Sequence, residues 1–470
     1  MLVFLLLIGT IVLWTTAMLF AYFAVASART PQGSVAWVFL LLGLPMIGIP
    51  AYLFLGNFRF KGYIVARRDS QRVIARIAAF AKEFEPVGDD DNVGYQAFES
   101  IAQAPIVSGN SVEILVNGAA SFSSMFAAID SAKSYILVQF YIIKDDTLGR
   151  EFKQKLIDAA LRGVHVRLLF DAVGSSKLPT EYLAELEDSG IETVNAHSLH
   201  GPRTRFQINF RNHRKTLVVD GVIGFTGGLN VGDEYMGRDP AFGPWRDTHC
   251  RLIGPVVLQL QLVFSEDWHW ATKQVLGDNL NWSPTRAPEN MDALLMATGP
   301  ADTLETGSLY FCAAISAAKN RIWTASPYLV PDVDILTVLK LAALRGVDVR
   351  IMVPEKADHY LTWLAAFAFF DELREVGVKI LKYQDGFMHQ KVLVVDEAIA
   401  SIGTTNMDNR SCRLNFEATV MVFDKRAACA VAAMLEEDFT RCKMVAYNLN
   451  EKSRLLRIGA PIARLFAPLL

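Results

Sequence analysis

Two long apolar runs open the chain. Residues 2–26 and 35–55 contain no charged side chain. At about 1.5 Å of rise per residue, a helix over either run is long enough to cross a hydrocarbon core about 30 Å thick. The link between them contains Pro31 and Gly33, which suit a tight turn. The pattern predicts a hairpin of two transmembrane helices within residues 1–58.

Basic residues after the second run orient the predicted hairpin. Six arginines and lysines lie within residues 59–76, against Arg29 alone in the link. Because an excess of basic residues marks cytoplasmic segments, the rest of the chain is expected in the cytoplasm. The small residues 26–28 resemble a signal-peptide cleavage site. No basic segment precedes the run, however, and the run is too long for a signal peptide.

Residues 59–103 are expected to form an amphipathic helix followed by an acidic linker. Apolar side chains from Val73 to Phe84 recur at helical spacing, with arginines elsewhere. Such a helix can lie on anionic lipid or pack against the rest of the protein, and the pattern leaves both open. Pro86, Gly88 and the acidic residues 89–91 interrupt it.

The chain after residue 103 contains an internal repeat. The segment AALRGVHVR at residues 159–167 returns as AALRGVDVR at 342–350, with eight of nine positions identical. Each copy predicts the end of a helix, a glycine cap and an apolar strand. Because repeated helix–strand units are typical of α/β folds, we predict two similar α/β lobes at residues 104–298 and 299–446. A basic, apolar tail follows at 447–470.

A second match between the lobes consists of polar residues. Both lobes carry the pattern HxKx4D, followed at equal spacing by a glycine and an asparagine. The members are His213, Lys215, Asp220, Gly227 and Asn230 in the first lobe and His389, Lys391, Asp396, Gly403 and Asn406 in the second. Two motifs with the same trailing residues indicate that each lobe supplies half of one site.

The residue types indicate phosphodiester chemistry. Valine-rich and leucine-rich segments after each lysine predict a buried strand, on which the histidine and lysine share one face and the aspartate is out of phase. Imidazole beside a cation supplies a nucleophile or general acid next to a charge for the phosphate oxygens, without a metal. The six His, Lys and Asp residues form the candidate catalytic set, although Asp220 and Asp396 are expected to hold a strand end or turn. Asn230 and Asn406 are expected to bind the phosphate.

Two carboxylates are candidates for orienting the histidines. A histidine nucleophile needs an acceptor for its other ring nitrogen, and Asp247 and Glu417 follow the two motifs. A surface charge or salt bridge is the alternative for each. The other histidines show no recurring ligand spacing and are expected to be structural, including His249 beside Asp247.

Composition narrows the class of protein. With a net charge of -3 and a pI near 6.3, the protein lacks the excess positive charge that is typical of nucleic-acid binders. Its mean hydropathy of +0.25 suits a chain that is partly solvated by lipid. The 5 cysteines form no CxxC pair. They therefore predict neither a disulfide framework nor a cysteine metal site, and they suit a reducing compartment.

On these residues the chain resembles the phospholipase D superfamily. Its signature HxKx4Dx6GSxN is met except that Gly228 and Thr404 replace the serine. The resemblance implies a two-lobed α/β/α sandwich with one site between the lobes, a phosphohistidine intermediate and no metal or other cofactor. By position, it implies that Asp247 orients His213 and that Glu417 orients His389.

Within the superfamily the chain is most similar to the bacterial cardiolipin synthase family, over nearly its whole length. The resemblance is carried by the apolar hairpin, by the segments 243–249, 326–332 and 409–411, and by the tail. The tail mixes arginines with apolar residues and suits either a bilayer interface or a helix docked on the body.

This resemblance implies a multi-pass enzyme of the bacterial inner membrane that acts on phosphatidylglycerol among anionic lipids. His213 would attack phosphorus and His389 would protonate the departing glycerol and then activate a second phosphatidylglycerol, or the two would exchange roles. The alternatives are a membrane phospholipase D using water or another alcohol, a nuclease, and an inactive membrane-tethered binding module. The hairpin and acidic pI disfavour a nuclease, and the two intact His/Lys pairs disfavour an inactive module.

Overall fold

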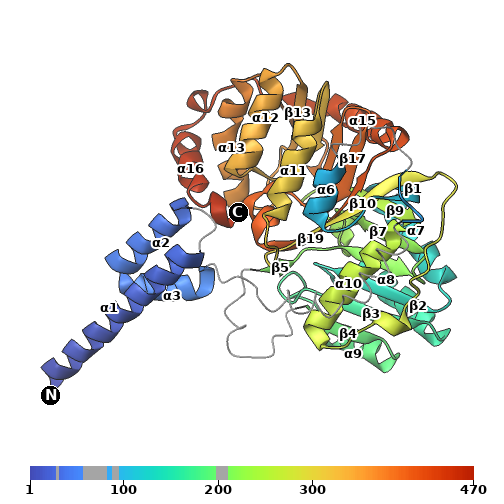
Figure 1. Cartoon of the computed structure of the whole chain (residues 1–470), viewed down its shortest axis with the longest axis horizontal. Helices are drawn as coiled ribbons and strands as arrows, with labels where there is room; N and C mark the ends of the chain where they lie inside the picture. The colour runs from blue at the N-terminus through green and yellow to red at the C-terminus, as the bar shows by residue number, and fades with distance from the viewer. Residues whose placement is uncertain (28–30, 57–81, 87–94, 197–209) are drawn as a thin grey trace. The chain divides into compact units, whose positions relative to one another are not determined.

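The computed structural model describes residues 1–27, 31–56, 82–86, 95–196 and 210–470, in two compact units that are treated separately. An N-terminal unit contains three apolar helices, and a larger unit contains the main sheet and the helices that cover it (Figure 1). Most of the predicted amphipathic helix and acidic linker lies outside the described residues.

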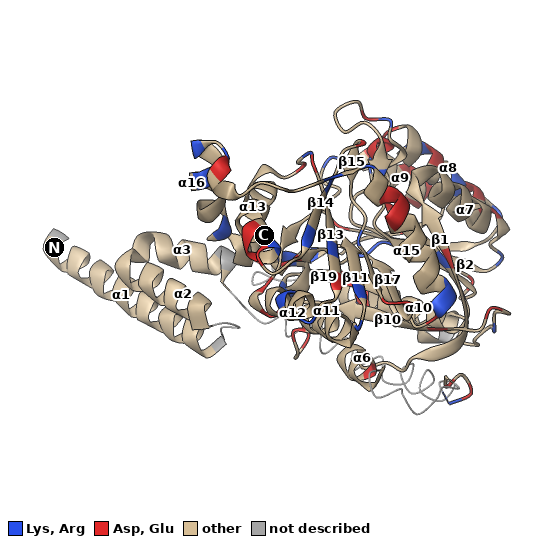
Figure 2. Cartoon of the chain, turned by 90° about the horizontal axis from the view of Figure 1, so that it is seen from above, with Lys and Arg blue, Asp and Glu red and all other residues tan. Residues whose placement is uncertain are grey.

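The first apolar run forms one continuous helix. α1 (Leu2–Ser27) includes the stretch Val3–Ala26, which is long and apolar enough to cross a membrane and has most of its side chains exposed. Ala21 and Ala24 are buried where α2 (Pro31–Gly43) and α3 (Pro45–Leu55) pack on α1, together with Leu41 and Tyr52. All three helices lack acidic and basic residues (Figure 2).

The second apolar run does not form the single helix predicted over residues 35–55. It is divided into α2 and α3 at Leu44, whose φ of -138° and ψ of 65° are not helical. Pro45 is the cause, because proline has no N–H to donate and its ring disfavours helical backbone at the preceding residue. Neither α2 nor α3 is long enough to meet the length that α1 meets.

The larger unit is built on one 16-stranded sheet with two similar halves. From the centre outward, the first half has the order β1 (Val107–Val116), β9 (Thr248–Ile253), β7 (Ile223–Gly227), β6 (Thr216–Val219), β2 (Tyr135–Phe140), β3 (His165–Phe170) and β4 (Glu192–Asn195). The second half has the order β10 (Met291–Thr298), β19 (Asn415–Val422), β17 (Ile399–Gly403), β16 (Val392–Val395), β11 (Arg321–Ala325), β13 (Asp348–Pro354), β14 (Lys379–Tyr383) and β20 (Cys442–Met444).

The repeat in the sequence is therefore a repeat in the fold. β1 pairs antiparallel with β10, and this pair joins the halves. The copies of the AALRGV segment end α8 (Thr147–Leu161) and α12 (Val333–Leu344) and lead through Gly163 and Gly346 into β3 and β13. Both glycines have positive φ, 90° and 89°, the left-handed conformation that glycine adopts without strain. The predicted α/β lobes are confirmed.

Helices cover both faces of the sheet. On one face, α10 (Val256–Thr272) and α15 (Lys425–Thr440) bury a core shared by both halves. On the other face, α7 (Asn117–Ser131), α8 and α9 (Thr180–Asp188) cover the first half. The second half is covered there by α6 (Tyr95–Ala102), α11 (Thr306–Ala317), α12, α13 (Tyr360–Arg374) and α16 (Arg454–Arg464).

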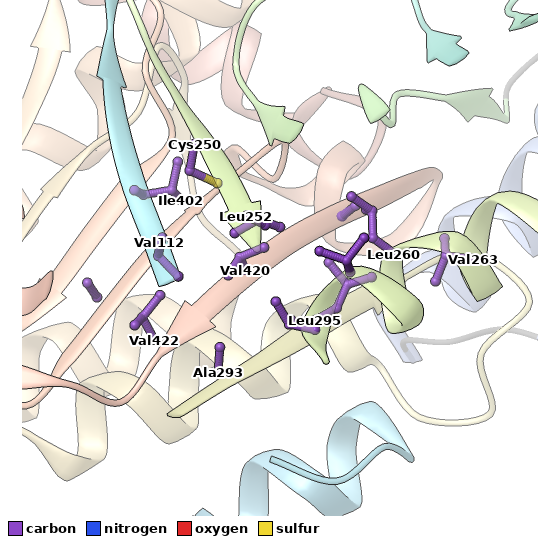
Figure 3. Close-up of a cluster of buried hydrophobic side chains, with 14 of the residues drawn as sticks. Val112, Cys250, Leu252, Leu260, Val263, Ala293, Leu295, Ile402, Val420 and Val422 are labelled. Carbon is purple, nitrogen blue, oxygen red and sulfur yellow. The ribbon is translucent and has the colours of Figure 1, made fainter. Parts of the chain in front are cut away.

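The shared core makes the halves one folding unit. Figure 3 shows side chains from β1, β9 and α10 of the first half beside those from β10, β17 and β19 of the second, among them Leu252, Leu295 and Val420. Because β10 is the counterpart of β1 and pairs with β19, we place the border between the halves before Met291. This is earlier than the predicted border between residues 298 and 299.

Short strands and helices lie between the main elements. They are β5 (Arg211–Asn212), β8 (Trp245–Arg246), β12 (Leu329–Val330), β15 (Phe387–Met388), β18 (Met407–Asp408), α14 (Asn409–Arg413) and the 3-10 helices Asp233–Met236, Gly277–Asn279, Leu449–Glu451 and Ala467–Leu469. Among these, β5 pairs with β19 and is the sixteenth strand of the main sheet. β8 of the first half pairs in parallel with β15 of the second. This pairing brings the segment before Asp247 beside the segment before His389.

Candidate active site

The two motif histidines lie at the junction of the halves. The backbone N–H of His389 donates to the carbonyl of Arg246 at 2.8 Å, and that of His213 donates to the carbonyl of Phe416 at 2.9 Å. The sequence had predicted that both histidines and both lysines lie on strands. In the structure they come just before β6 and β16. Each histidine is therefore fixed to the backbone of the opposite half.

Each histidine is paired with a carboxylate across this junction. Nδ1 of His213 lies 2.8 Å from Oε2 of Glu417, and Nδ1 of His389 lies 2.8 Å from Oδ2 of Asp247. The predicted pairing of Asp247 with His213 and of Glu417 with His389 is wrong. Each carboxylate instead contacts the histidine of the other half, because β8 lies beside β15 and β5 lies beside β19.

These pairs fix the state of the imidazoles. A carboxylate only accepts hydrogen bonds, so each Nδ1 carries a proton and each Nε2 keeps its lone pair. Burial lowers the pKa of His213 despite the opposing effect of Glu417. Burial, reinforced by Lys391, lowers the pKa of His389 to about 4. Both imidazoles are consequently neutral at neutral pH.

The two carboxylates are ionised although both are completely buried. Burial alone would raise their pKa values, but the positive charge of Lys391 and the hydrogen bond from His389 lower the pKa of Asp247. His213 and then Lys215 do the same for Glu417. The site therefore holds two negative charges behind two neutral rings.

Each lysine donates to the backbone carbonyl of its own histidine, and Lys391 also approaches the ring of His389. Nζ of Lys215 donates to the backbone carbonyl of His213 at 2.6 Å. Nζ of Lys391 lies 2.8 Å from Nδ1 and 2.9 Å from Nε2 of His389. Burial is the main cause that lowers the pKa of Lys215 to about 7 and that of Lys391 to about 8.

The two asparagines are buried beside this cluster, but their environments differ. Oδ1 of Asn230 accepts from the N–H of Ile142 at 3.1 Å, and its Nδ2 donates to the hydroxyl of Tyr235 at 2.9 Å. Oδ1 of Asn406 has no hydrogen-bond partner among the described residues. Asn230 retains one amide hydrogen and Asn406 retains both acceptor and donor capacity for a ligand.

The two departures from the superfamily signature have structural roles. A Cβ at Gly228 would lie 1.9 Å from Oδ1 of Asp247, so the glycine makes room for that carboxylate. The Thr404 hydroxyl accepts from the N–H of Ala418 at 2.9 Å and also helps to lower the pKa of Glu417. The residue at the serine position thus supports the carboxylate of its own half.

Asp220 and Asp396 belong to turns, where their carboxylates bind backbone N–H groups. The carboxylate of Asp220 accepts from the backbone N–H groups of residues 133–135, and that of Asp396 accepts from those of residues 319–321. Both have positive φ, 53° and 51°. These contacts agree with the structural role expected for both residues and not with the catalytic set in which they were included.

Aromatic residues that the sequence had not indicated surround the histidines. The Tyr141 ring lies 5.0 Å from the His213 ring, centroid to centroid. On the other side, Trp245 lies 5.2 Å, Phe387 6.0 Å and Tyr235 6.4 Å from the ring of His389. Trp245 stands two residues before Asp247, so its proximity could have been inferred. Tyr141 carries no comparable signal, because it lies far from the motif in sequence.

Two buried ion pairs hold the carboxylate segments in place. Arg214 pairs with Asp267 on α10 at 2.6 Å, and its Nε donates to the carbonyl of Glu417 at 3.1 Å. Arg246 pairs with Asp438 on α15 at 2.7 Å and donates to the carbonyl of Asp247 at 2.7 Å. An arginine thus anchors the backbone of each carboxylate residue to a helix beneath the sheet. Neither arginine was singled out from the sequence.

His249 lies outside the two histidine–carboxylate pairs. It is completely buried in β9, and neither of its ring nitrogens has a hydrogen-bond partner among the described residues. Burial lowers its pKa to about 3, so the ring is neutral. Within the part of the chain that the structure describes, no three His, Cys, Asp or Glu side chains are arranged to hold a metal ion.

Known proteins share both the sequence and the fold. The family model described as "Cardiolipin synthase, PLD-like domain" matches residues 125–239 and 311–443. Cardiolipin synthase A of Pseudomonas putida is 42% identical over 460 residues, which cover 96% of this chain and 95% of the relative. Cardiolipin synthase A of Pseudomonas aeruginosa is 42% identical over 475 residues, covering 99% of this chain and 96% of the relative.

A solved structure agrees with the fold alone. The phosphatidylserine synthase of Haemophilus influenzae superposes with a TM-score of 0.61 at 15% identity, over 80% of this chain and 100% of that one. The matched segments of the family model fall in the two halves of the sheet, and the full-length identity extends through the N-terminal helices. The chain belongs to the cardiolipin synthase family of phospholipase D-like proteins.

Proposed function

We propose that this chain synthesises cardiolipin by transferring the phosphatidyl group of one phosphatidylglycerol to another. The observation that carries the proposal is the pair of histidine–carboxylate contacts at 2.8 Å, each with a lysine alongside, in a chain 42% identical to cardiolipin synthases over nearly its whole length. Two histidines suit a reaction in which one histidine becomes covalently bound while the other moves protons.

In the first step, Nε2 of His213 attacks phosphorus and the bond to the headgroup oxygen breaks. His389 gives a proton to that oxygen, and glycerol leaves. In the second step, His389 takes the proton from a glycerol hydroxyl of the second phosphatidylglycerol. That oxygen attacks phosphorus, the P–N bond breaks, and His213 is released with cardiolipin. Lys215 and Lys391 balance the charge on the phosphate oxygens during both steps.

The contacts of Lys391 support these roles for the two histidines. Its Nζ lies 2.9 Å from Nε2 of His389, so His389 can exchange a proton with a lysine whose pKa is about 8. Lys215 contacts the backbone of His213 and leaves Nε2 of that ring to attack phosphorus. A bound phosphodiester adds negative charge and raises the pKa of His389, which favours its protonation in the complex.

We also propose that α1 anchors the enzyme in the bacterial inner membrane with the larger unit in the cytoplasm. The support is the uncharged stretch Val3–Ala26 and the basic residues within 59–76. A reporter enzyme that is active only in the cytoplasm, fused after Leu470, should be active. Activity only of a periplasmic reporter at that position would contradict the orientation.

The reaction is tested with purified full-length protein in phosphatidylglycerol vesicles without added metal. We expect cardiolipin and an equal amount of glycerol. Phosphatidic acid without cardiolipin would identify a hydrolase instead. His213→Ala and His389→Ala should abolish product while the protein remains folded and inserted, and a wild-type rate from either variant would contradict the two-histidine mechanism.

A further inference from the structure

The helix near the C-terminus is fixed to the larger unit by its small residues. Ala460 and Ala463 of α16 are buried, and Gly459 lies against the side chain of Leu364 on α13. Arg464 donates to the carbonyl of Ala368 at 3.3 Å. The backbone N–H of Arg410 donates to the carbonyl of Leu470 at 2.7 Å, which ties down the end of the chain. The predicted tail is a docked helix.

The outer face of α16 is nevertheless apolar. Three large apolar side chains of α16 and two just after its end recur at helical spacing and are exposed. They are Leu455 at 75% exposed, Ile458 at 63%, Ile462 at 52%, Leu465 at 77% and Phe466 at 46%. A helix that is docked by one face normally presents polar residues on the other, so a continuous exposed apolar stripe indicates a partner.

The charged residues of this C-terminal segment are all basic, and one of them, Arg464, pairs with Glu372 of α13 at 3.2 Å. Residues 452–470 contain Lys452, Arg454, Arg457 and Arg464 and no acidic residue. Arg454 and Arg457 are exposed beside the stripe, and Figure 2 shows the basic colouring of α16. An apolar stripe flanked by arginines suits an anionic bilayer surface, whereas a second copy of this helix would bring like charges together.

The stripe continues toward the active site along α13. Gly459 lies against Leu364 and Arg464 beside Ala368, so α13 and α16 run in the same direction. The N-terminal turn of α13 presents Tyr360 and Leu361, which are 59% and 42% exposed. Just before this turn, Asp358 is close enough to Lys391 to influence its pKa and accepts a hydrogen bond from the hydroxyl of Tyr328.

We propose that the exposed stripe of α16, together with Tyr360 and Leu361, docks the larger unit on an anionic bilayer surface. The apolar side chains enter the interface, and Arg454 and Arg457 contact lipid phosphates. The docking brings the start of α13, and with it the edge of the histidine cluster, to the lipid surface. The contact itself does not depend on which reaction the cluster catalyses.

The experiment uses the full-length protein in nanodiscs and measures hydrogen exchange of α16. Nanodiscs that contain phosphatidylglycerol are compared with nanodiscs of phosphatidylcholine alone and with detergent micelles. We expect exchange within α16 to be about tenfold slower in the phosphatidylglycerol discs than in the other two, because docking suppresses local opening. α12, which lies elsewhere on the surface, serves as an internal reference.

A triple variant, Leu455→Gln, Ile458→Gln and Leu465→Gln, should lose this protection. It should also raise the phosphatidylglycerol fraction needed for half-maximal activity and leave the maximal rate unchanged. The matched control replaces three exposed apolar residues elsewhere, Leu161, Val275 and Leu344, by glutamine. If the first triple variant unfolds, Arg454→Gln with Arg457→Gln tests the same surface, because it should reduce the protection with the apolar stripe intact.

Three outcomes would overturn the proposal. Equal exchange in all three environments would show that no bilayer covers the stripe. Equal protection in phosphatidylcholine discs would remove the requirement for anionic lipid. Protection in detergent that grows with protein concentration would make a second copy of the chain the partner. A protein that makes no cardiolipin but shows the expected exchange would contradict the proposed reaction and leave the docking surface supported.

Discussion

Replacing Glu417 by glutamine tests the crossed pairing of histidines and carboxylates directly. The two side chains have the same shape, and Glu417 is completely buried, so the change removes a charge without creating space. Nδ2 of Asn415 donates to Oε1 of Glu417 at 3.1 Å. This contact will orient the new amide with its oxygen toward Asn415 and its NH2 toward His213, which reverses the tautomer that the carboxylate imposes.

The expected loss of rate follows from two effects. A hydrogen bond to a charged group is worth about 1 to 2 kcal/mol more than a neutral one, or about 5- to 30-fold in rate. The reversed tautomer places a proton on Nε2, the atom that attacks phosphorus. The comparable carboxylate-to-amide change in serine proteases costs about 10,000-fold. We therefore expect Glu417→Gln to slow capture of the phosphatidyl group by about 100- to 10,000-fold.

The assay compares two donors in single turnovers, with the labelled protein trapped by denaturation. One donor is phosphatidylglycerol, and the other carries p-nitrophenol, a leaving group that needs no general acid. Glu417→Gln should capture label slowly from both donors. Asp247→Asn impairs only the acid, His389, so it should capture label at nearly the wild-type rate from the p-nitrophenyl donor. Glu113→Gln, at an exposed position on β1, is the matched control.

Mapping the labelled histidine completes the test. If the label is found on His213, the crossed pairing requires that Glu417→Gln capture label slowly. The p-nitrophenyl donor should not restore the rate of this variant. If the histidines exchange roles, the same reasoning links His389 to Asp247. Label on His213 with an unrescued defect in Asp247→Asn would refute the crossed pairing. A Glu417→Gln rate within about threefold of wild type would refute the orienting role itself.

Three further results are expected. The pKa values of Lys215 and Lys391, about 7 and about 8, mean that both lose their charge as pH rises. The value of kcat/KM should therefore fall above about pH 7. The value of kcat should fall only at higher pH, because a bound phosphate anion raises both pKa values. Profiles of kcat/KM and kcat that stay flat to about pH 9 would contradict the role of the charged lysines. Gly228→Ser, which restores the superfamily residue, should lower activity at least about tenfold with little loss of folded protein. The reason is that a Cβ at this position would lie 1.9 Å from Oδ1 of Asp247. Unchanged turnover would show that the carboxylate of Asp247 can move freely. Arg246→Gln breaks a buried ion pair and should lower the free energy of unfolding by about 3 to 5 kcal/mol. Denaturant titration measures this loss, with Arg238→Gln at an exposed pair as the control. Equal stabilities of the two variants would contradict the anchoring role.

Sequence patterns predicted the repeated architecture because the relevant signals are local. A glycine cap after a helix, an apolar strand and a motif of fixed spacing all depend on neighbouring residues, and both copies of each are present. Strand parity is not what separates Asp220 and Asp396 from the histidines, because the histidines and lysines precede β6 and β16 and the aspartates follow these strands. Pro45 was equally visible, yet hydrophobic length dominated the prediction for residues 35–55, and the break at Leu44 was missed.

The pairing across the halves could not be predicted from local patterns. Asp247 and Glu417 follow the motifs of their own halves at similar distances, and nothing near them in sequence shows which histidine they face. That choice depends on the β1–β10 junction, on the contact of β8 with β15 and on that of β5 with β19, all of which join residues far apart in the chain. Arg214 and Arg246 were missed for the same reason, since their partners lie on α10 and α15.

The shared core and the crossed contacts have a consequence during synthesis of the protein. A ribosome releases the first half, up to α10, well before Glu417 has been made. A nascent chain at this stage holds His213 without its carboxylate and Asp247 without its histidine. The two-histidine reaction cannot begin on such a chain, because His389 has not been made and His213 lacks the carboxylate that fixes its tautomer. Completion of β19 therefore supplies the last group of the two histidine–carboxylate pairs, Glu417.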